Sequence, residues 1–364
     1  MAKIAVSVGD LNGISLELIL KSHKKLSKIC TPYYFIHKNL LLKACKLLDK
    51  KLPKDFHIVE FYGSKDCVFK GNKFYSKLDV SYESDYEIRP SQIDKKSGAY
   101  SFASFKAACN FVSMNYAKAL VTLSIHKKAW QEAGILYKGH TEALRDFFKQ
   151  EAIMVLGNKK LFVALFTEHI ALRDVSKHIT VEKLCNFFIN LYKSSKFKKI
   201  GVLAFNPHAS DFKTIGGEEE EIMLRAIRIS NVYLKQKEQS KQVLEKLIAD
   251  ENFLRHCEAS SSGKNIYLED LLVADTAFRA DALKRCNRLV SMYHDLALAP
   301  LKALYFDESV NISLNLPIIR TSPDHGTAFD KAYKNAKISN KSYIEAVKTA
   351  LKLAKIKSHQ NKKL

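Results

Sequence analysis

Short apolar runs alternate with longer amphipathic segments through most of the chain. The first run, Lys3 to Val8, is followed by the turn Gly9 to Gly13 and by a helical pattern from Ile14 to about Lys25. The segment from Ser97 to Tyr116 is also amphipathic, because its large apolar residues fall on one helical face. Short apolar runs bounded by polar residues favour buried strands of a parallel sheet. Strands that alternate with helices predict an α/β fold.

The composition is that of a globular protein large enough for two domains. The chain has 364 residues, of which 47% are hydrophobic and 27% charged. No stretch approaches the roughly 18 unbroken apolar residues of a membrane helix, and the first residues lead directly into a strand rather than a signal peptide. The seven cysteines are scattered, with no Cys-x-x-Cys pair, which indicates reduced thiols. We therefore expect a cytoplasmic protein with no membrane partner.

The net charge of +21 raises the question of nucleic-acid binding. The lysines, however, are spread over amphipathic stretches that also carry acids, as in residues 235–241. The sequence has no RNA-binding or zinc-finger pattern. We expect no nucleic-acid partner, although such a surface would attract an anionic small molecule.

Three of the apolar runs lead into a histidine. These are His169, His208 and His294, preceded by the runs 161–166, 200–205 and 288–293. Ligands bind to open α/β sheets beyond the carboxyl ends of the strands, so the three imidazoles would share one rim. Three histidines with an open position are typical of a catalytic metal site. Two further runs lead into His37 and His126, so a hydrogen-bonded histidine at the sheet edge is the alternative for each of the five.

Other side chains are suited to holding an anion. His140 and Thr141 stand just before a predicted helix, whose first turn presents free backbone N–H groups. Arg320 follows the apolar run 314–319, so it ends a strand as the histidines do. By contrast, we expect Glu219 to Glu221 only to stabilise the first turn of a helix.

The common nucleotide and hydrolase fingerprints are missing. No Gly-x-Gly-x-x-Gly follows a strand, since Gly9 and Gly13 have a different spacing. There is also no phosphate-binding P-loop and no Gly-x-Ser-x-Gly elbow. A standard Rossmann dehydrogenase is therefore not favoured.

Six motifs, in order and covering the chain from Ile4 to the last helix, resemble the PdxA family of 4-hydroxythreonine-4-phosphate dehydrogenases. They are Gly-His-Thr-Glu at 139–142, Thr167 to Asp174, Asn206-Pro-His-Ala, Ala274-Asp-Thr, Tyr293-His-Asp, and the run from Val310 to Ala328.

The resemblance implies a fold and a domain organisation. It implies two α/β/α domains like those of the isocitrate and isopropylmalate dehydrogenases, with the active site in the cleft between them. That fold binds NAD without the glycine fingerprint. Residues 1–130 and 300–364 would form a discontinuous domain on the NAD side, and residues 131–299 a central domain with the metal ligands and the dimer contacts.

The resemblance also implies a role for each motif. The metal ligands would be His169, His208 and His294. Substrate contacts would be His140, Thr141, Lys302, Asn311 and Arg320. Asp275, Lys302 and His140 would be catalytic, and Asp324, Gly326 and Thr327 would contact the cofactor. The active site would be shared across a homodimer.

The implied reaction is oxidation of 4-phosphohydroxy-L-threonine at C3, followed by decarboxylation to 3-amino-2-oxopropyl phosphate in pyridoxal 5′-phosphate biosynthesis. The oxidant would be NAD or NADP. One divalent ion would assist, with zinc first and magnesium, manganese or cobalt as alternatives. Either Asp275 or Lys302 would carry the proton. Two alternatives stay open: a related oxidative decarboxylase acting on another phosphorylated or carboxylated hydroxy acid, and an inactive anion-binding protein on the same scaffold.

The chain departs from the family in several loops. Leu11-Asn12 replaces Pro-Ala in the first turn, and Ser210 to Lys213 replaces a glycine-rich stretch. Leu296 stands in place of glutamine after Tyr-His-Asp, and Ser124-Ile125 replaces Gly-Pro before His126. The predicted metal and anion-binding residues are unchanged.

Overall fold

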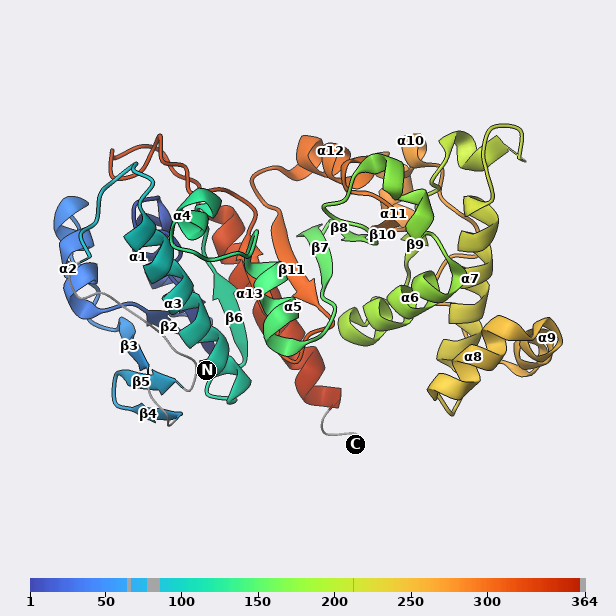
Figure 1. The fold of residues 1–364 in the computed structure, drawn as a ribbon, viewed down its shortest axis with the longest axis horizontal. Helices are drawn as coiled ribbons and strands as arrows, with labels where there is room; N and C mark the ends of the chain where they lie inside the picture. Colours follow the sequence, from blue (N-terminus) through green and yellow to red (C-terminus); the bar gives the residue numbers. More distant parts are fainter. Residues whose placement is uncertain (64–66, 77–85, 212, 361–364) are drawn as a thin grey trace. The chain divides into compact units, whose positions relative to one another are not determined.

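The computed structural model describes residues 1–63, 67–76, 86–211 and 213–360. The chain divides into two compact units. Unit 1 contains Met1–Ala152 and Asp307–Leu364, and unit 2 contains Ile153–Phe306. Each unit has strands and helices that alternate along the chain (Figure 1), which confirms the predicted α/β class.

Unit 1 is built on a mainly parallel sheet with the strand order β4-β5-β3-β2-β1-β6-β12-β11. Its strands are β1 (Lys3–Ser7), β2 (Thr31–Phe35), β3 (His57–Gly63), β4 (Val68–Lys70), β5 (Lys73–Ser76), β6 (Ala119–Thr122), β11 (Val310–Leu314) and β12 (Arg320–Pro323). Strand β1 pairs in parallel with β2 on one side and with β6 on the other. Strands β4 and β11 run antiparallel to their neighbours β5 and β12.

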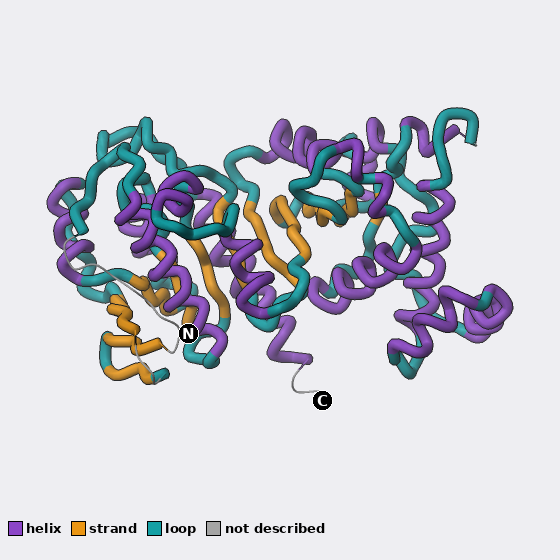
Figure 2. Tube along the Cα trace, viewed as in Figure 1, coloured by secondary structure: helices purple, strands orange, loops and turns teal. Residues whose placement is uncertain are grey.

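Unit 1 has six helices among its described residues, and two of them, α3 and α13, pack against this sheet (Figure 2). The six helices are α1 (Ser15–Leu26), α2 (Lys38–Leu47), α3 (Lys95–Ser113), α4 (Lys127–Glu132), α5 (His140–Phe148) and α13 (Lys341–Gln360). Helix α3 contacts β1, β2, β5 and β6, whereas α13 contacts β6, β11 and β12. Asp94 starts α3 by accepting a hydrogen bond from the backbone N–H of Lys96 at 2.6 Å.

Unit 2 has a four-stranded sheet with the order β7-β8-β10-β9. Its strands are β7 (Ile153–Asn158), β8 (Leu161–Leu165), β9 (Gly201–Val202) and β10 (Arg288–Ser291). Its helices are η1 (Leu172–Asp174), η2 (Ser176–His178), α6 (Val181–Ser195), η3 (Pro207–Asp211), α7 (Glu219–Lys235), α8 (Lys241–Ala249), α9 (Glu251–Ser260), α10 (Ala274–Ala277), α11 (Ala280–Arg285) and α12 (His294–Tyr305). Val163, Leu289 and Leu301 are among the buried residues that join this sheet to α12.

The unit boundaries differ from the predicted ones. Residues 131–152, expected in the central domain, belong to unit 1, because α5 packs its Phe147 ring against Phe105 of α3 at 5.7 Å. Residues 300–306 belong to unit 2, because α12 continues through Pro300 to Tyr305 without a break. Among the described residues, no helix is both long and apolar enough to span a bilayer.

Candidate functional site

The strands that precede the three predicted metal-binding histidines are neighbours in unit 2. β8, β10 and β9 are adjacent and parallel, so their carboxyl ends lie at one sheet edge. His169 follows β8, His208 follows β9, and His294 begins α12 directly after β10. The three segments therefore meet at one edge, as the apolar runs predicted.

Two of these histidines lie close together. The ring centroids of His169 and His294 are 5.7 Å apart, with their planes tilted by 40°. His294 Nδ1 lies 2.7 Å from Asp295 Oδ1, so this carboxylate can accept the Nδ1 proton. A histidine held in this way keeps the lone pair of Nε2 for a metal, which is the usual arrangement of a ligating imidazole. The donor chemistry of this pair therefore fits a divalent ion.

His208 is exposed and lies in an unusual stretch of backbone. It follows Asn206-Pro207, and its φ of 53° and ψ of 26° are in the left-handed region. Within the ranges that the structure describes, no group of three or more His, Cys, Asp or Glu side chains is arranged to hold a metal ion. His208 thus does not complete a three-histidine centre with His169 and His294 inside one chain.

Asp275 and Lys302, the two candidate proton carriers, also belong to unit 2. Asp275 is exposed in the short helix α10. Lys302 is half-buried in α12, with its Nζ 5.3 Å from the centroid of the Phe306 ring.

Arg320 lies in unit 1 and is almost completely buried, with 3% of its surface exposed. Its Nε and Nη2 donate to Thr122 Oγ1 at 3.0 and 2.8 Å. Its Nη1 donates to Asn311 Oδ1 at 3.3 Å and to Ser313 Oγ at 3.2 Å. Thr122 and Ser313 were not among the predicted site residues. Their only signal in the sequence is a small hydroxyl side chain inside an otherwise apolar strand.

The partners of Arg320 are all neutral. Among the described residues, no carboxylate forms an ion pair with it, and burial lowers the pKa of its guanidinium. A buried cation is costly without a counter-charge. Arg320 is therefore a buried guanidinium held only by neutral partners, and its charge and N–H groups are suited to an anion.

His140 and Thr141 begin helix α5 in the same unit. The His140 ring packs against Phe105 and Trp130, with centroids 4.7 and 5.3 Å away, and its buried Nε2 has no hydrogen-bond partner. Burial, and then the nearby charge of Arg320, hold the pKa of His140 well below its usual value. His140 is thus a neutral imidazole at pH 7. The first backbone N–H groups of α5, including that of Thr141, add to the field that favours an anion.

The predicted cofactor residues form a loop that packs on the first turn of the chain. Thr327 O accepts a hydrogen bond from Ile14 N at 3.1 Å, and a Cβ on Gly13 would lie only 2.7 Å from that oxygen. Asp324 N donates to Ser342 Oγ at 2.9 Å. At Gly326, by contrast, a Cβ would meet no atom within 4 Å. The loop is fixed at both ends and open in its middle.

One of the altered family positions, Ser124, contacts this loop. Ser124 Oγ donates to the carbonyl oxygen of His325 at 2.6 Å, and the His126 ring stacks on Phe329 at 4.9 Å. His126 is thus a neighbour of the predicted cofactor loop.

Asn12, another altered position, accepts hydrogen bonds from the Tyr86 hydroxyl at 2.7 Å and from Arg89 N at 2.8 Å. The substitution at Asn12 therefore ties the first turn to the segment that follows residue 85.

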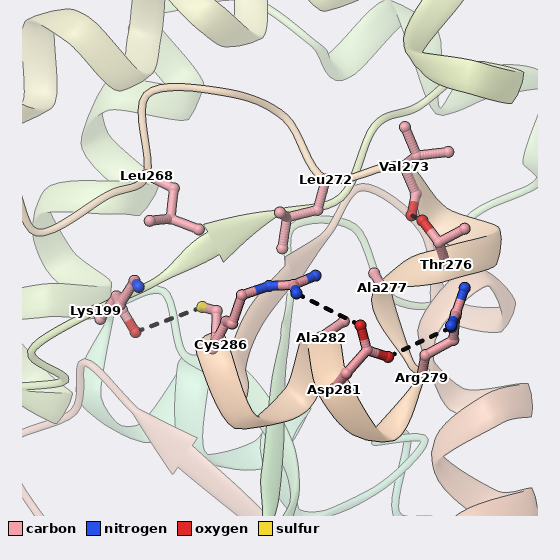
Figure 3. Close-up of a pocket in the computed structure, with 11 residues that line it drawn as sticks. Lys199, Leu268, Leu272, Val273, Thr276, Ala277, Arg279, Asp281, Ala282 and Cys286 are labelled. Carbon is pink, nitrogen blue, oxygen red and sulfur yellow. Dashed lines mark hydrogen bonds and ion pairs between the residues drawn. The ribbon is translucent and has the colours of Figure 1, made fainter.

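Unit 2 also contains a cavity of about 250 Å³ that uses none of the predicted site residues (Figure 3). Apolar side chains, among them Leu268 and Leu272, line part of it. On the charged side of the cavity, Asp281 forms ion pairs with Arg279 and Arg285, each at 3.4 Å. Thr276 contributes to the lining, whereas its neighbour Asp275 does not.

Comparison with known proteins identifies close relatives over nearly the whole chain. Residues 28–350 match the family model described as pyridoxal phosphate biosynthetic protein PdxA. A 4-hydroxythreonine-4-phosphate dehydrogenase of Campylobacter jejuni (strain RM1221) is 57% identical over 362 residues, which cover 97% of this chain and 99% of the relative. One of Helicobacter pylori (strain J99) is 41% identical, covering 95% of this chain and 98% of the relative.

Solved structures agree with these matches. The crystal structure of 4-hydroxythreonine-4-phosphate dehydrogenase from Klebsiella pneumoniae superposes with a TM-score of 0.69 at 25% identity, covering 97% of this chain and all of the other. A terephthalate 1,2-cis-dihydrodiol dehydrogenase from Burkholderia xenovorans, at 15% identity, has a TM-score of 0.58 and covers 96% of this chain and 97% of its own, which indicates a shared fold.

Proposed function

The chain belongs to the family of the pyridoxal phosphate biosynthetic protein PdxA, and from this premise we propose that it oxidises 4-phosphohydroxy-L-threonine at C3 with NAD or NADP. The C3 hydroxyl would lose its proton to a base, and the C3–H bond would supply the hydride that the nicotinamide accepts. The resulting ketone is β to the carboxylate, so carbon dioxide leaves and the enolate is protonated to 3-amino-2-oxopropyl phosphate.

The observation that carries this proposal is the buried Arg320 without a carboxylate partner. A phosphate or carboxylate group would supply the missing charge and accept charge-assisted hydrogen bonds from the guanidinium. Asn311 and Thr141 are the neutral contacts that we assign to the same anionic group. Asn311 accepts a hydrogen bond from Arg320, and the charge of Arg320 acts on His140, the residue before Thr141.

The neutral state of His140 suits a contact with the substrate. Its Nε2 is buried and has no partner, so a substrate hydroxyl or phosphate oxygen would satisfy it. The lowered pKa means that it positions the substrate without adding a second positive charge beside Arg320. We assign proton transfer at C3 to Asp275 or Lys302.

We propose that His169 and His294 bind a divalent ion, zinc first and magnesium, manganese or cobalt as alternatives. When bound, such an ion acts as a Lewis acid toward the hydroxyl group and the enolate. Asp295 would orient His294 for this role, because it accepts the Nδ1 proton.

We assign the third ligand position to His208 of a second copy of the chain. Two observations support a homodimer of this kind. His208 does not join the other two histidines within one chain. Large apolar residues close to His169 and His208 in sequence are exposed, namely Ile170, Leu172 and Ile215 at 40%, 66% and 50%. A partner would cover such residues.

The loop of Asp324, Gly326 and Thr327 is our candidate for the dinucleotide contact. Its support is local: both ends are anchored, and the open space at Gly326 allows close approach of a ligand to the backbone.

The direct test is to incubate the protein with 4-phosphohydroxy-L-threonine, NAD and zinc or cobalt, and to follow NADH absorbance and release of carbon dioxide. We expect both products in equal amounts. NADH formation only from another phosphorylated or carboxylated hydroxy acid would favour the related decarboxylase. Tight substrate binding without NADH from any of them would favour an inactive anion-binding protein.

A further inference from the structure

Glu220 is a buried carboxylate at the start of helix α7. Its relative exposure is 5%, whereas Glu218 and Glu221 beside it are exposed. Glu220 Oε1 accepts hydrogen bonds from the backbone N–H groups of Phe205 and Asn206 at 3.1 and 2.6 Å. Its Oε2 accepts from Asn206 Nδ2 at 2.8 Å and from Ser210 Oγ at 2.6 Å. Four donors thus converge on one side chain, which is more than stabilisation of a helix end requires.

The segment that Glu220 holds is the one that carries His208. His208, Ala209 and Ser210 have φ values of 53°, 54° and 66°, so three successive residues with a Cβ are in the left-handed region. Such a run is unfavourable for L-residues and persists only where the surroundings fix it. The donors from Asn206 and Ser210 lie on the two sides of His208 in the sequence. The carboxylate therefore closes the turn around the histidine.

Gly216 provides independent support that this loop is tightly built. A Cβ at Gly216 would overlap Ser210 Oγ and would lie 2.7 Å from Asn206 Nδ2. The returning chain thus packs on the same two side chains that donate to Glu220. A larger residue at this position would displace them.

The four hydrogen bonds require the ionised carboxylate. Burial disfavours the charge, but the hydrogen bonds from Ser210 and Asn206 outweigh it, and the pKa of Glu220 is lowered. A glutamine of the same shape would have one accepting oxygen in place of two. Its NH2 group is itself a donor and would point at the donor groups around Glu220, so it could not accept their hydrogen bonds.

We propose that Glu220 is a positioning residue for the metal centre: it fixes the turn from Phe205 to Ser210 so that the exposed His208 imidazole is held in one orientation for a divalent ion. This inference rests on the proposed function, in which His208 is a metal ligand. In this proposal Glu220 does not contact the substrate, and its effect on the metal centre is exerted through the position of His208.

The test compares Glu220→Gln with Glu218→Gln in the full-length protein. Glu218 precedes Glu220 by two residues, is exposed, and lies at the start of the same helix. We measure the affinity for Co²⁺ alone by competition with a chelator, the visible absorption of the bound Co²⁺, and the melting temperature. Glu220→Gln should weaken Co²⁺ binding by roughly 10- to 100-fold and change the absorption spectrum, whereas Glu218→Gln should match the wild type.

Unchanged Co²⁺ affinity and spectrum in Glu220→Gln, even with a lower melting temperature, would show a purely structural role and overturn the inference. If Glu220→Gln does not fold, Ser210→Ala takes its place, because it removes one of the four hydrogen bonds. It should weaken binding several-fold, and no change would again contradict the inference. A wild-type protein that binds no Co²⁺ and forms no NADH would instead contradict the proposed function itself.

Discussion

The proposed anion site around Arg320 in unit 1 and the histidine edge of unit 2 differ in how complete they are within one chain. Arg320 is buried, and every partner that holds it comes from unit 1. In unit 2 the His294 side chain is 38% exposed, and its partner Asp295 is 87% exposed. His208 does not reach the pair. The surroundings of Arg320 are desolvated and fixed within one chain, whereas the histidine edge is open to solvent, and we propose that an ion and a further ligand complete it.

The difference has an electrostatic consequence. Charge interactions are strong where water is excluded and weak where it is not. Arg320 can therefore hold an anion tightly without a second cation beside it, which fits the neutral state of His140. In the proposed function, the histidine edge acts through the charge of a bound metal ion. We expect substitutions to act on substrate affinity in unit 1 and on metal content in unit 2.

The largest expected effect comes from Arg320→Met, which keeps much of the side-chain volume and removes the charge. We expect the affinity for 4-phosphohydroxy-L-threonine to fall by about 2–5 kcal/mol, because a buried hydrogen-bonded charge is lost. Isothermal titration calorimetry on the metal-loaded protein measures this directly. Arg89→Met is the matched control, since Arg89 is 54% exposed and already paired with Asp94 in the same unit. If both variants bound the substrate with equal affinity, Arg320 would not be the residue that holds its anionic group.

A smaller effect is expected on the stability of unit 1 when the pH is lowered. Burial lowers the pKa of His37 to about 4, against a weaker opposing effect of Glu60, and burial also lowers the pKa of His140. The unfolded chain takes up these protons near pH 6.5, before the folded chain does. Unfolding therefore binds protons as pH falls from about 7 toward 4, and unit 1 loses stability over that range.

Trp130 is the only tryptophan and lies buried in unit 1, so its fluorescence reports the unfolding of that unit. Between pH 7 and pH 5, His37 should account for a loss on the order of 1–2 kcal/mol in urea unfolding. His37→Gln should remove this part of the loss, and substitution of the exposed His57 by Gln should not. The same pH dependence in both variants would show that His37 is protonated in the folded state.

The sequence allowed the α/β class and the strand arrangement in unit 2 to be predicted, because these depend on short apolar runs and on where they end. The α/β class and the neighbouring positions of the strands that precede His169, His208 and His294 follow from short apolar runs. The prediction that Arg320 ends a strand was wrong: Arg320 is the first residue of β12, and residues 315–319 form the connection from the antiparallel strand β11. What could not be predicted depends on contacts between distant residues. Thr122 lies 198 positions from Arg320, and nothing in the apolar run 119–122 indicates that its hydroxyl holds a guanidinium.

Two errors have the same cause. Glu220 was expected to stabilise only its own helix, because the amphipathic pattern does not show that its side chain turns toward Asn206 and Ser210. The unit boundary was expected near residue 130, because the packing of Phe147 on Phe105 has no local signal. Of the altered loops, Asn12 accepts hydrogen bonds from the Tyr86 hydroxyl and from Arg89 N. Ser210 donates to Glu220, while Phe212 lies outside the described residues.

The metal centre shared between two copies is tested most directly by mixing inactive variants. His169→Ala and His208→Ala chains are unfolded together, refolded with zinc, and assayed for NADH formation. If His208 acts in a second copy, each mixed dimer has one intact site, and roughly a quarter of wild-type activity should return. A mixture of His169→Ala with His294→Ala should stay inactive, because both residues would belong to the same chain. No recovery in the first mixture, or equal recovery in both, would contradict the shared centre.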